Sequence, residues 1–108
     1  MNLFSRLFTK NDSDLDGTEF KSQFLITKNS ALLDVRTLSE FRSGTILNAK
    51  NMDVMSPDFN TKASKLDDSK TYFVFCRSGN RSGNAVNIMK REGLKAFNLL
   101  GGIGAFPK

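Results

Sequence analysis

Hydrophobic residues along the chain gather in short runs, which polar and glycine-containing segments separate. The strongest run, residues 71–75, reads Thr-Tyr-Phe-Val-Phe, and its β-branched and aromatic side chains predict a buried strand. Residues 80–92 follow with apolar side chains at helical spacing and a glycine directly after them, which predicts a helix. Shorter apolar runs at residues 31–35 and 96–100 predict two further strands.

The segments between these runs carry weaker signals. Helical spacing and helix-start residues predict short helices over residues 18–27, 38–42 and 56–66, and residues 46–52 are expected to be irregular or strand-like. Strands that alternate with helices at this spacing predict an α/β domain. We expect a central, mostly parallel sheet of four or five strands with helices on both faces.

The first part of the chain is polar and lacks a clear periodicity. We expect residues 1–18 to be a flexible lead-in to a domain that spans residues 19–108. Asp12, Asp14 and Asp16 match the start of a calcium-binding loop, but the position of the closing glutamate is occupied by Gln23. No apolar helix precedes them either, so a helix start is the better interpretation.

Composition narrows the chemistry mainly through what it lacks. The 108 residues include no histidine, which excludes imidazole-based catalysis and histidine-ligated metal sites. The single cysteine excludes an internal disulfide, and no apolar run approaches the roughly 20 residues that span a bilayer. We expect a cytoplasmic, monomeric protein with no metal, no cofactor and no membrane partner.

Positive charge is concentrated in one part of the chain. The net charge is +5, and residues 70–95 hold six basic residues against one acidic residue, whereas the remaining basic and acidic residues cancel. A local positive field of this kind favours an anion site and not a nucleic-acid partner.

The candidate chemistry lies between the strongest strand and the strongest helix. This loop begins with the only cysteine and comprises Cys76, Arg77, Ser78, Gly79, Asn80, Arg81 and Ser82. Ligands of open α/β sheets bind at the carboxyl ends of the strands, where a helix start presents free N–H groups and a partial positive charge. Such surroundings lower the pKa of a cysteine and favour the nucleophilic thiolate.

Each neighbour of the cysteine has an expected task. Gly79 lets the loop curl, so that successive amides form an anion-binding nest around the sulfur. Arg77 and Arg81 supply permanent positive charge, and Ser82 can donate its hydroxyl or cap the first helical turn. We expect Arg77 at the pocket mouth, and Arg81 bound to loop carbonyls or to a nearby carboxylate such as Asp34.

This loop resembles the active-site loop of the rhodanese family, whose pattern is Cys-x-x-Gly-x-Arg-Ser/Thr. Every fixed position of that pattern is met here. Residues 33–36, 40–41 and 44–46 are similar to the family's Asp-x-Arg, Glu-Phe/Tyr and Gly-His-Ile stretches, and residues 100–106 to its closing Gly-Gly turn. The departures are Thr45 at the usual histidine, and Ile103 and Phe106 at the usual tryptophan positions.

The resemblance implies a three-layer domain with five strands and a two-step sulfur transfer. Cys76 would attack the outer sulfur of a donor such as thiosulfate, become a persulfide, and pass that sulfur to cyanide, a thiol or a protein acceptor. Asp34 and Arg36 would support the loop, and a charged pair just beyond a strand often ties loops together. The same resemblance implies no cofactor.

Two other functions remain open at this point. A phosphatase or arsenate reductase typically has a Cys-x5-Arg loop, one residue longer than the Cys-x4-Arg loop here, to surround a tetrahedral oxyanion. A non-catalytic binding or sulfur-relay module would keep the fold and have little activity on thiosulfate.

The glycines at positions 101, 102 and 104 predict a tight turn near the pocket. A nucleotide-binding glycine motif would be followed by a helix, and no helix follows here.

Overall fold

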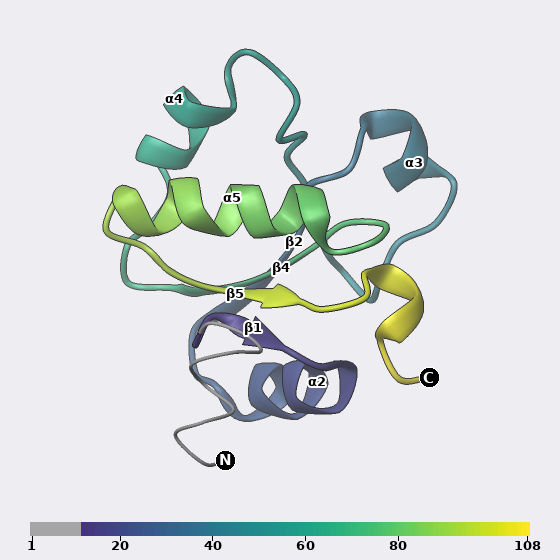
Figure 1. Ribbon diagram of the computed structural model, residues 1–108. Helices are drawn as coiled ribbons and strands as arrows, with labels where there is room; N and C mark the ends of the chain where they lie inside the picture. The colour runs from purple at the N-terminus through teal and green to yellow at the C-terminus, as the bar shows by residue number, and fades with distance from the viewer. Residues whose placement is uncertain (1–11) are drawn as a thin grey trace.

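The computed structural model describes residues 12–108, so most of the predicted lead-in, residues 1–11, lies outside the described residues. The described chain forms a five-stranded sheet in which every pairing is parallel, with the strand order β1-β5-β4-β2-β3 (Figure 1). The strands are β1 (Asp14–Leu15), β2 (Ser30–Asp34), β3 (Lys50–Asn51), β4 (Thr71–Phe75) and β5 (Lys95–Leu99).

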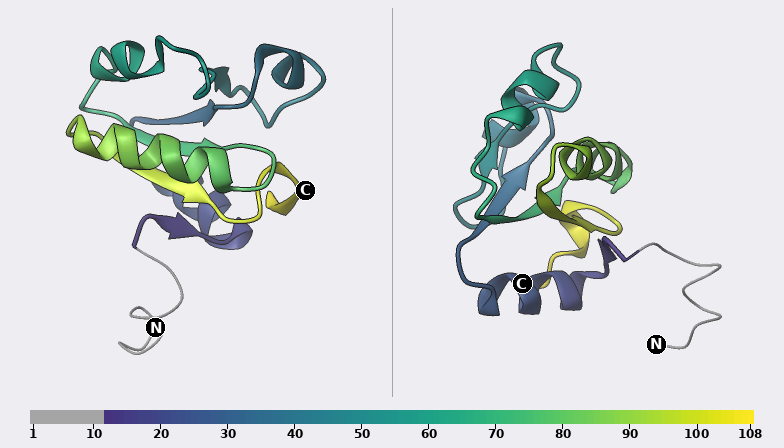
Figure 2. Two further views of the ribbon diagram at one scale, coloured as in Figure 1. Left: turned by 45° about the horizontal axis from the view of Figure 1, so that its top comes forward. Right: turned by 90° about the vertical axis from the view of Figure 1, so that its left-hand side faces the viewer.

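Helices cover both faces of this sheet. They are α2 (Gly17–Ile26), α3 (Leu38–Arg42), α4 (Phe59–Ser64), α5 (Asn80–Arg91) and the 3₁₀ helix η1 (Ile103–Ala105). Figure 2 shows α5 and α2 on opposite sides of the strands. The prediction of a mostly parallel α/β sheet with two covered faces is therefore confirmed.

The two hydrophobic cores follow from the alternation of side chains along the central strand β4. Tyr72 and Val74 are buried in the cluster that includes residues of α4 and α5. Phe73 and Phe75 are buried in the other cluster, together with Phe20 of α2. Successive residues of a strand point to opposite faces, so a continuous apolar strand supplies both cores. The next residue along, Cys76, consequently belongs to the α5 side.

Aromatic packing fixes α2 against the sheet. Phe20 is completely buried, and its ring meets Phe73 edge-on with 5.5 Å between the ring centroids. Phe106, which follows η1, meets Phe20 in a similar geometry at 6.2 Å. Edge-to-face pairs of this kind stabilise a core by about 0.5–1.5 kcal/mol beyond the area that they bury.

The start of the described chain corrects the predicted lead-in. Asp14 and Leu15 form strand β1, which pairs with β5, and Leu15 is buried in the core. A two-residue strand is too short to produce a periodic signal, which is why the sequence did not indicate it. Asp16 accepts a hydrogen bond from the Glu19 amide and so caps α2, as the helix-start interpretation of this acidic segment expected.

The other boundaries agree with the predictions to within a few residues. The predicted strand over residues 71–75 and the predicted helix over residues 38–42 have the bounds of β4 and α3. The largest shifts are at β3, which begins at Lys50, four residues after the predicted start, and at α4, which begins at Phe59, three residues after its predicted start. Within residues 12–108, no helix is long and apolar enough to cross a membrane.

Candidate active site

The carboxyl ends of β2 and β4 bring the candidate residues to one edge of the sheet. Asp34 pairs with Phe75 in the parallel register, and the Val35 amide donates to the Phe75 carbonyl. The turn that begins at Asp34 therefore lies beside the loop that begins at Cys76. This is the edge at which open α/β sheets place their ligands.

Cys76 is completely buried, and hydrogen-bond donors surround its sulfur. The Gly79 amide donates to Sγ at 3.1 Å and the Ser82 amide at 3.3 Å, and the Ser82 hydroxyl lies within donating distance, also at 3.3 Å. Gly79 occupies the N-cap position of α5, where no side chain caps the helix, and Ser82 is the third helical residue. The sulfur thus takes the place of a capping side chain and faces the positive end of the helix dipole.

The electrostatics of this nest favour an anionic sulfur. Burial raises the pKa of the Cys76 thiol, but the hydrogen bonds from the Ser82 side chain and amide, and from the Gly79 and Ser78 amides, together outweigh it. The pKa of Cys76 is consequently below the ordinary value of a cysteine. The thiolate is the nucleophilic form, so this is the effect that a reactive cysteine needs.

The glycine turn after β5, residues 101–102, packs against the backbone of the loop that begins at Cys76. Gly102 has a φ of 78°, and a Cβ there would collide with the carbonyl of Arg77. The Ile103 amide donates to the Cys76 carbonyl at 2.8 Å. Gly79, with a φ of 101°, curls against the same turn. Glycine is needed at both places because L-residues rarely adopt such angles and because the two backbones touch.

Arg81 binds a nearby carboxylate, as expected, but this carboxylate belongs to Glu40 and not to Asp34. Its guanidinium donates to Glu40 through two parallel hydrogen bonds, Nη1 to Oε1 at 2.7 Å and Nη2 to Oε2 at 3.0 Å. Loop carbonyls or a nearby carboxylate such as Asp34 were expected; the oxygens of Asp34 are already bound by Arg36 and Thr45. Hydrogen bonds from Arg81, with further ones from the Thr37 amide and hydroxyl, lower the pKa of Glu40 to about 2. The first turn of α5 is thereby fixed to α3.

The Asp34–Arg36 pair ties two loops together, as a charged pair beyond a strand was expected to do. Asp34 is completely buried, and its carboxylate accepts from the Arg36 guanidinium at 2.7 Å and from the Thr45 hydroxyl at 2.9 Å. Arg36 also donates to the Gly44 carbonyl at 2.6 Å. Thr45, which stands where the rhodanese pattern usually has histidine, therefore contributes to this network.

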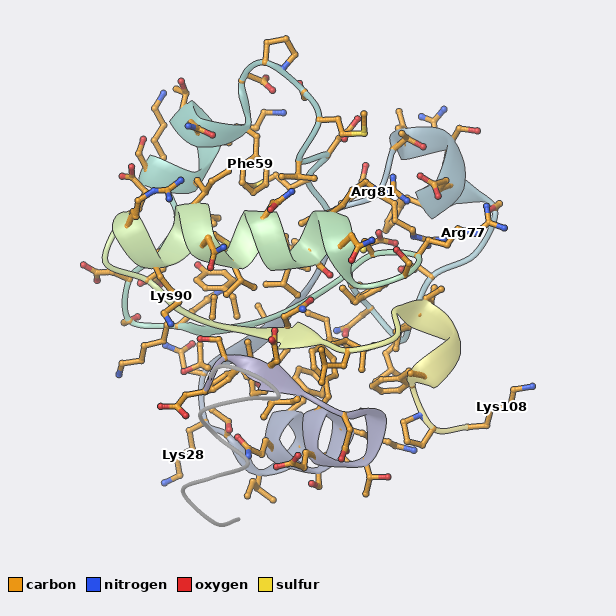
Figure 3. The ribbon with its side chains drawn as sticks, in the orientation of Figure 1. Lys28, Phe59, Arg77, Arg81, Lys90 and Lys108 are labelled. Carbon is orange, nitrogen blue, oxygen red and sulfur yellow. The ribbon has the colours of Figure 1, made fainter. Side chains whose placement is uncertain are left out.

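The remaining loop residues face solvent. Arg77, Ser78 and Asn80 are exposed. Figure 3 shows Arg77 and Arg81 on the same side of the molecule, near the start of α5, with Lys28 and Lys90 toward the other side. Unlike Arg81, Arg77 has no carboxylate partner within residues 12–108. Its charge is available to an incoming anion.

The sequence analysis missed Asn98, a buried polar residue of β5 that contacts the site. Its amide oxygen accepts a hydrogen bond from the Ser82 hydroxyl, and its amide nitrogen donates to the Gly79 carbonyl at 3.3 Å. The available signal was a single amide side chain inside an otherwise apolar strand, since a buried polar group needs partners.

Within residues 12–108, no group of three or more histidine, cysteine, aspartate or glutamate side chains could hold a metal ion.

Comparison of the sequence with known proteins identifies relatives with sulfurtransferase names. YtwF of Bacillus subtilis, a candidate sulfurtransferase, is 36% identical over 75 residues, which cover 69% of this chain and 71% of that protein. A candidate mitochondrial thiosulfate sulfurtransferase of Schizosaccharomyces pombe is 35% identical over 79 residues, which cover 63% of this chain. The matched region spans only 56% of the yeast protein's length.

Solved structures of the same fold agree with these relatives. A rhodanese-like domain protein of Staphylococcus aureus superimposes with a TM-score of 0.75 at 27% identity, over 89% of this chain and 92% of that one. A rhodanese-related protein of Thermoplasma volcanium gives a TM-score of 0.73 at 28% identity, over 87% and 94%. The Rhodanese family profile, described as a rhodanese-like domain, matches residues 18–108. The chain therefore belongs to the rhodanese-like domain family.

Proposed function

We propose that this protein is a sulfurtransferase that carries sulfane sulfur as a persulfide on Cys76. The observation that carries the proposal is the convergence of the Gly79 amide and the Ser82 amide and hydroxyl on Cys76 Sγ. The sulfurtransferase names of the relatives support the reaction class. The substrates we propose are a small anionic donor of the thiosulfate type and a thiol or cyanide acceptor.

The proposed reaction has two nucleophilic steps and needs no cofactor. The Cys76 thiolate attacks the outer sulfur of thiosulfate, a new sulfur–sulfur bond forms, and sulfite leaves with the electron pair of the broken bond. Cyanide or a thiolate then attacks the outer sulfur of the persulfide and releases the Cys76 thiolate. Sulfite leaves as a stable anion, so the absence of histidine from the chain removes no required general acid.

Hydrogen-bond donors in fixed positions would stabilise the charge that moves during both steps. The amides around Cys76 are held by α5 and by the glycine turn, so they need little rearrangement when charge develops. Arg77 would attract the anionic donor from solvent. Cys76 is completely buried in this conformation, so access of a donor to the sulfur requires displacement of residues around it.

The size of the loop favours sulfur chemistry over phosphate chemistry. Cys76 to Arg81 is a six-residue loop, one residue shorter than the Cys-x5-Arg loop of phosphatases. Its amides converge on Cys76 Sγ, and we expect a nest of this size to suit the terminal sulfur of a persulfide. A phosphate would have to place three oxygens among the same donors.

A paired assay tests this assignment. The native protein is expected to form thiocyanate from thiosulfate and cyanide, and to hydrolyse an aryl phosphate negligibly. Insertion of one Gly between Gly79 and Asn80 should widen the nest, lower thiocyanate formation and strengthen oxyanion binding. A Gly inserted between Asp67 and Asp68, in an exposed turn, is the control and should leave both activities unchanged. Efficient aryl phosphate turnover by the native protein would contradict the proposal.

A further inference from the structure

The Ser82 hydroxyl lies between two acceptors and has one proton to donate. Its Oγ is 2.5 Å from Asn98 Oδ1 and 3.3 Å from Cys76 Sγ. A hydroxyl donates to one acceptor at a time, so the two bonds exclude each other. The shorter distance and the better acceptor both favour Asn98 as long as the sulfur is a neutral thiol.

The orientation of the Asn98 amide is fixed by its other contacts. Nδ2 donates to Asp14 Oδ1 at 3.0 Å and to the Gly79 carbonyl at 3.3 Å. A carboxylate and a carbonyl accept only, so the nitrogen must face them and Oδ1 must face Ser82. Asn98 is 3% exposed, so its amide has little contact with solvent.

We propose that Asn98 is a positioning residue that acts through Ser82: it holds the Ser82 proton while Cys76 is neutral and yields it when the sulfur becomes anionic. The inference rests on the proposed function, because that is where negative charge forms on Cys76. The hydroxyl changes acceptor because a hydrogen bond to a charged acceptor is roughly twice as strong as one between neutral groups.

The exchange affects how readily the Cys76 thiol ionises, which can be measured. Each time Ser82 turns to the thiolate, the buried Asn98 oxygen loses its donor, and this cost opposes ionisation. Asn98 therefore makes the thiolate less stable than Ser82 acting alone would. A less stabilised thiolate is intrinsically the stronger nucleophile, so the pair balances the amount of thiolate against its reactivity.

The test is the pH dependence of Cys76 alkylation by iodoacetamide in the native protein, Asn98→Leu, Ser82→Ala and the double variant. Leucine is similar in size to asparagine and neither donates nor accepts. Asn98→Leu frees the hydroxyl for the sulfur, so the midpoint of the pH profile should fall by about 0.5–1 unit, the value of one hydrogen bond. In the Ser82→Ala background the same replacement should leave the midpoint unchanged.

Other outcomes would overturn the proposal. An unchanged or raised midpoint in Asn98→Leu, or an equal shift with and without the Ser82 hydroxyl, would show that Asn98 serves only as scaffold. If Asn98→Leu does not fold, Asn98→Ala removes the same acceptor with a smaller side chain. It should lower the midpoint in the native but not in the Ser82→Ala background, and equal shifts in both would contradict the exchange. Alkylation needs no sulfur donor, so failure of persulfide formation remains a separate result.

Discussion

The chain turns twice at the same edge of the sheet, after β2 and after β4, and each turn begins with a buried group that can carry negative charge. After β2 this group is Asp34, whose carboxylate is bound by the Arg36 guanidinium at 2.7 Å. After β4 it is Cys76, and every hydrogen-bond donor to its sulfur among residues 12–108 is uncharged. Both groups are completely buried.

The difference between the two turns explains why one is structural and the other is suited to chemistry. A guanidinium in direct contact compensates the charge of Asp34 and holds its carboxylate by hydrogen bonds, so the pair ties the two loops together. Amide and hydroxyl dipoles stabilise an anionic sulfur while its electron pair stays available for attack. The cations of the second turn are elsewhere: Arg81 is bound to Glu40, and Arg77 is exposed.

The largest effect on stability should come from breaking the first turn. Asp34→Ala leaves the buried Arg36 guanidinium without its counter-ion, and this should lower the free energy of unfolding by about 3–5 kcal/mol in urea titrations. Lys62→Ala, which breaks the exposed Asp58–Lys62 pair, is the control and should cost far less. A small loss in Asp34→Ala would contradict the structural role of the pair.

Arg81→Ala should affect both the second turn and the fold. Loss of the bonds to Glu40 releases the first turn of α5, which carries the Ser82 amide that donates to Cys76. We expect about 1 kcal/mol less stability and roughly tenfold lower kcat/KM for thiosulfate. Arg81→Lys keeps the charge without the bidentate geometry and should recover only part of the activity. Full activity in Arg81→Ala would show that the turn does not depend on α3.

The Arg81–Glu40 pair should also give stability a specific pH dependence. The pKa of Glu40 is about 2 in the folded protein against an ordinary value of 4.5. Since folding lowers this pKa, ionised Glu40 stabilises the protein above pH 4.5, and the contribution is lost as the pH falls toward 2. The stability difference between the native protein and Glu40→Gln should shrink over that interval. A difference that does not vary with pH would contradict the pair's contribution.

Arg77→Ala should have the smallest effect, because Arg77 is exposed and has no carboxylate partner within residues 12–108. We expect the KM for thiosulfate to rise roughly two- to fivefold at low salt, with the thermal midpoint unchanged. Lys28→Ala removes a cation on the other side of the molecule and should change neither quantity (Figure 3). A destabilised Arg77→Ala protein would reverse the roles of the two arginines.

Local signals in the sequence were sufficient for several elements. Residues 71–75 and 38–42 were predicted with the bounds of β4 and α3, since an unbroken apolar run and a helix with a capping box are local signals. Strand β1 was not predicted because its two residues are held by pairing with β5, which is distant in sequence. Local patterns carry no information about such a partner.

The features of the site also separate into those that local sequence predicts and those that it does not. The nest around Cys76 could be predicted, because a strand, a glycine and a helix start are contiguous in sequence. The partner of Arg81 could not, since Glu40 is brought to it only by the packing of α3. The role of Asn98 was also hidden, because it depends on the close approach of β5 to the loop. Both depend on contacts between segments that are far apart in the sequence, which local patterns do not reveal.

The central claim is that the uncharged donors around Cys76 make it the carrier of sulfur, and intact mass spectrometry tests this most directly. After incubation with thiosulfate, the native protein should gain the mass of one sulfur atom and lose it again on addition of cyanide. Cys76→Ser should gain nothing, because the chain has no other thiol. A sulfur adduct on Cys76→Ser, or a native protein that takes up no sulfur, would contradict the account.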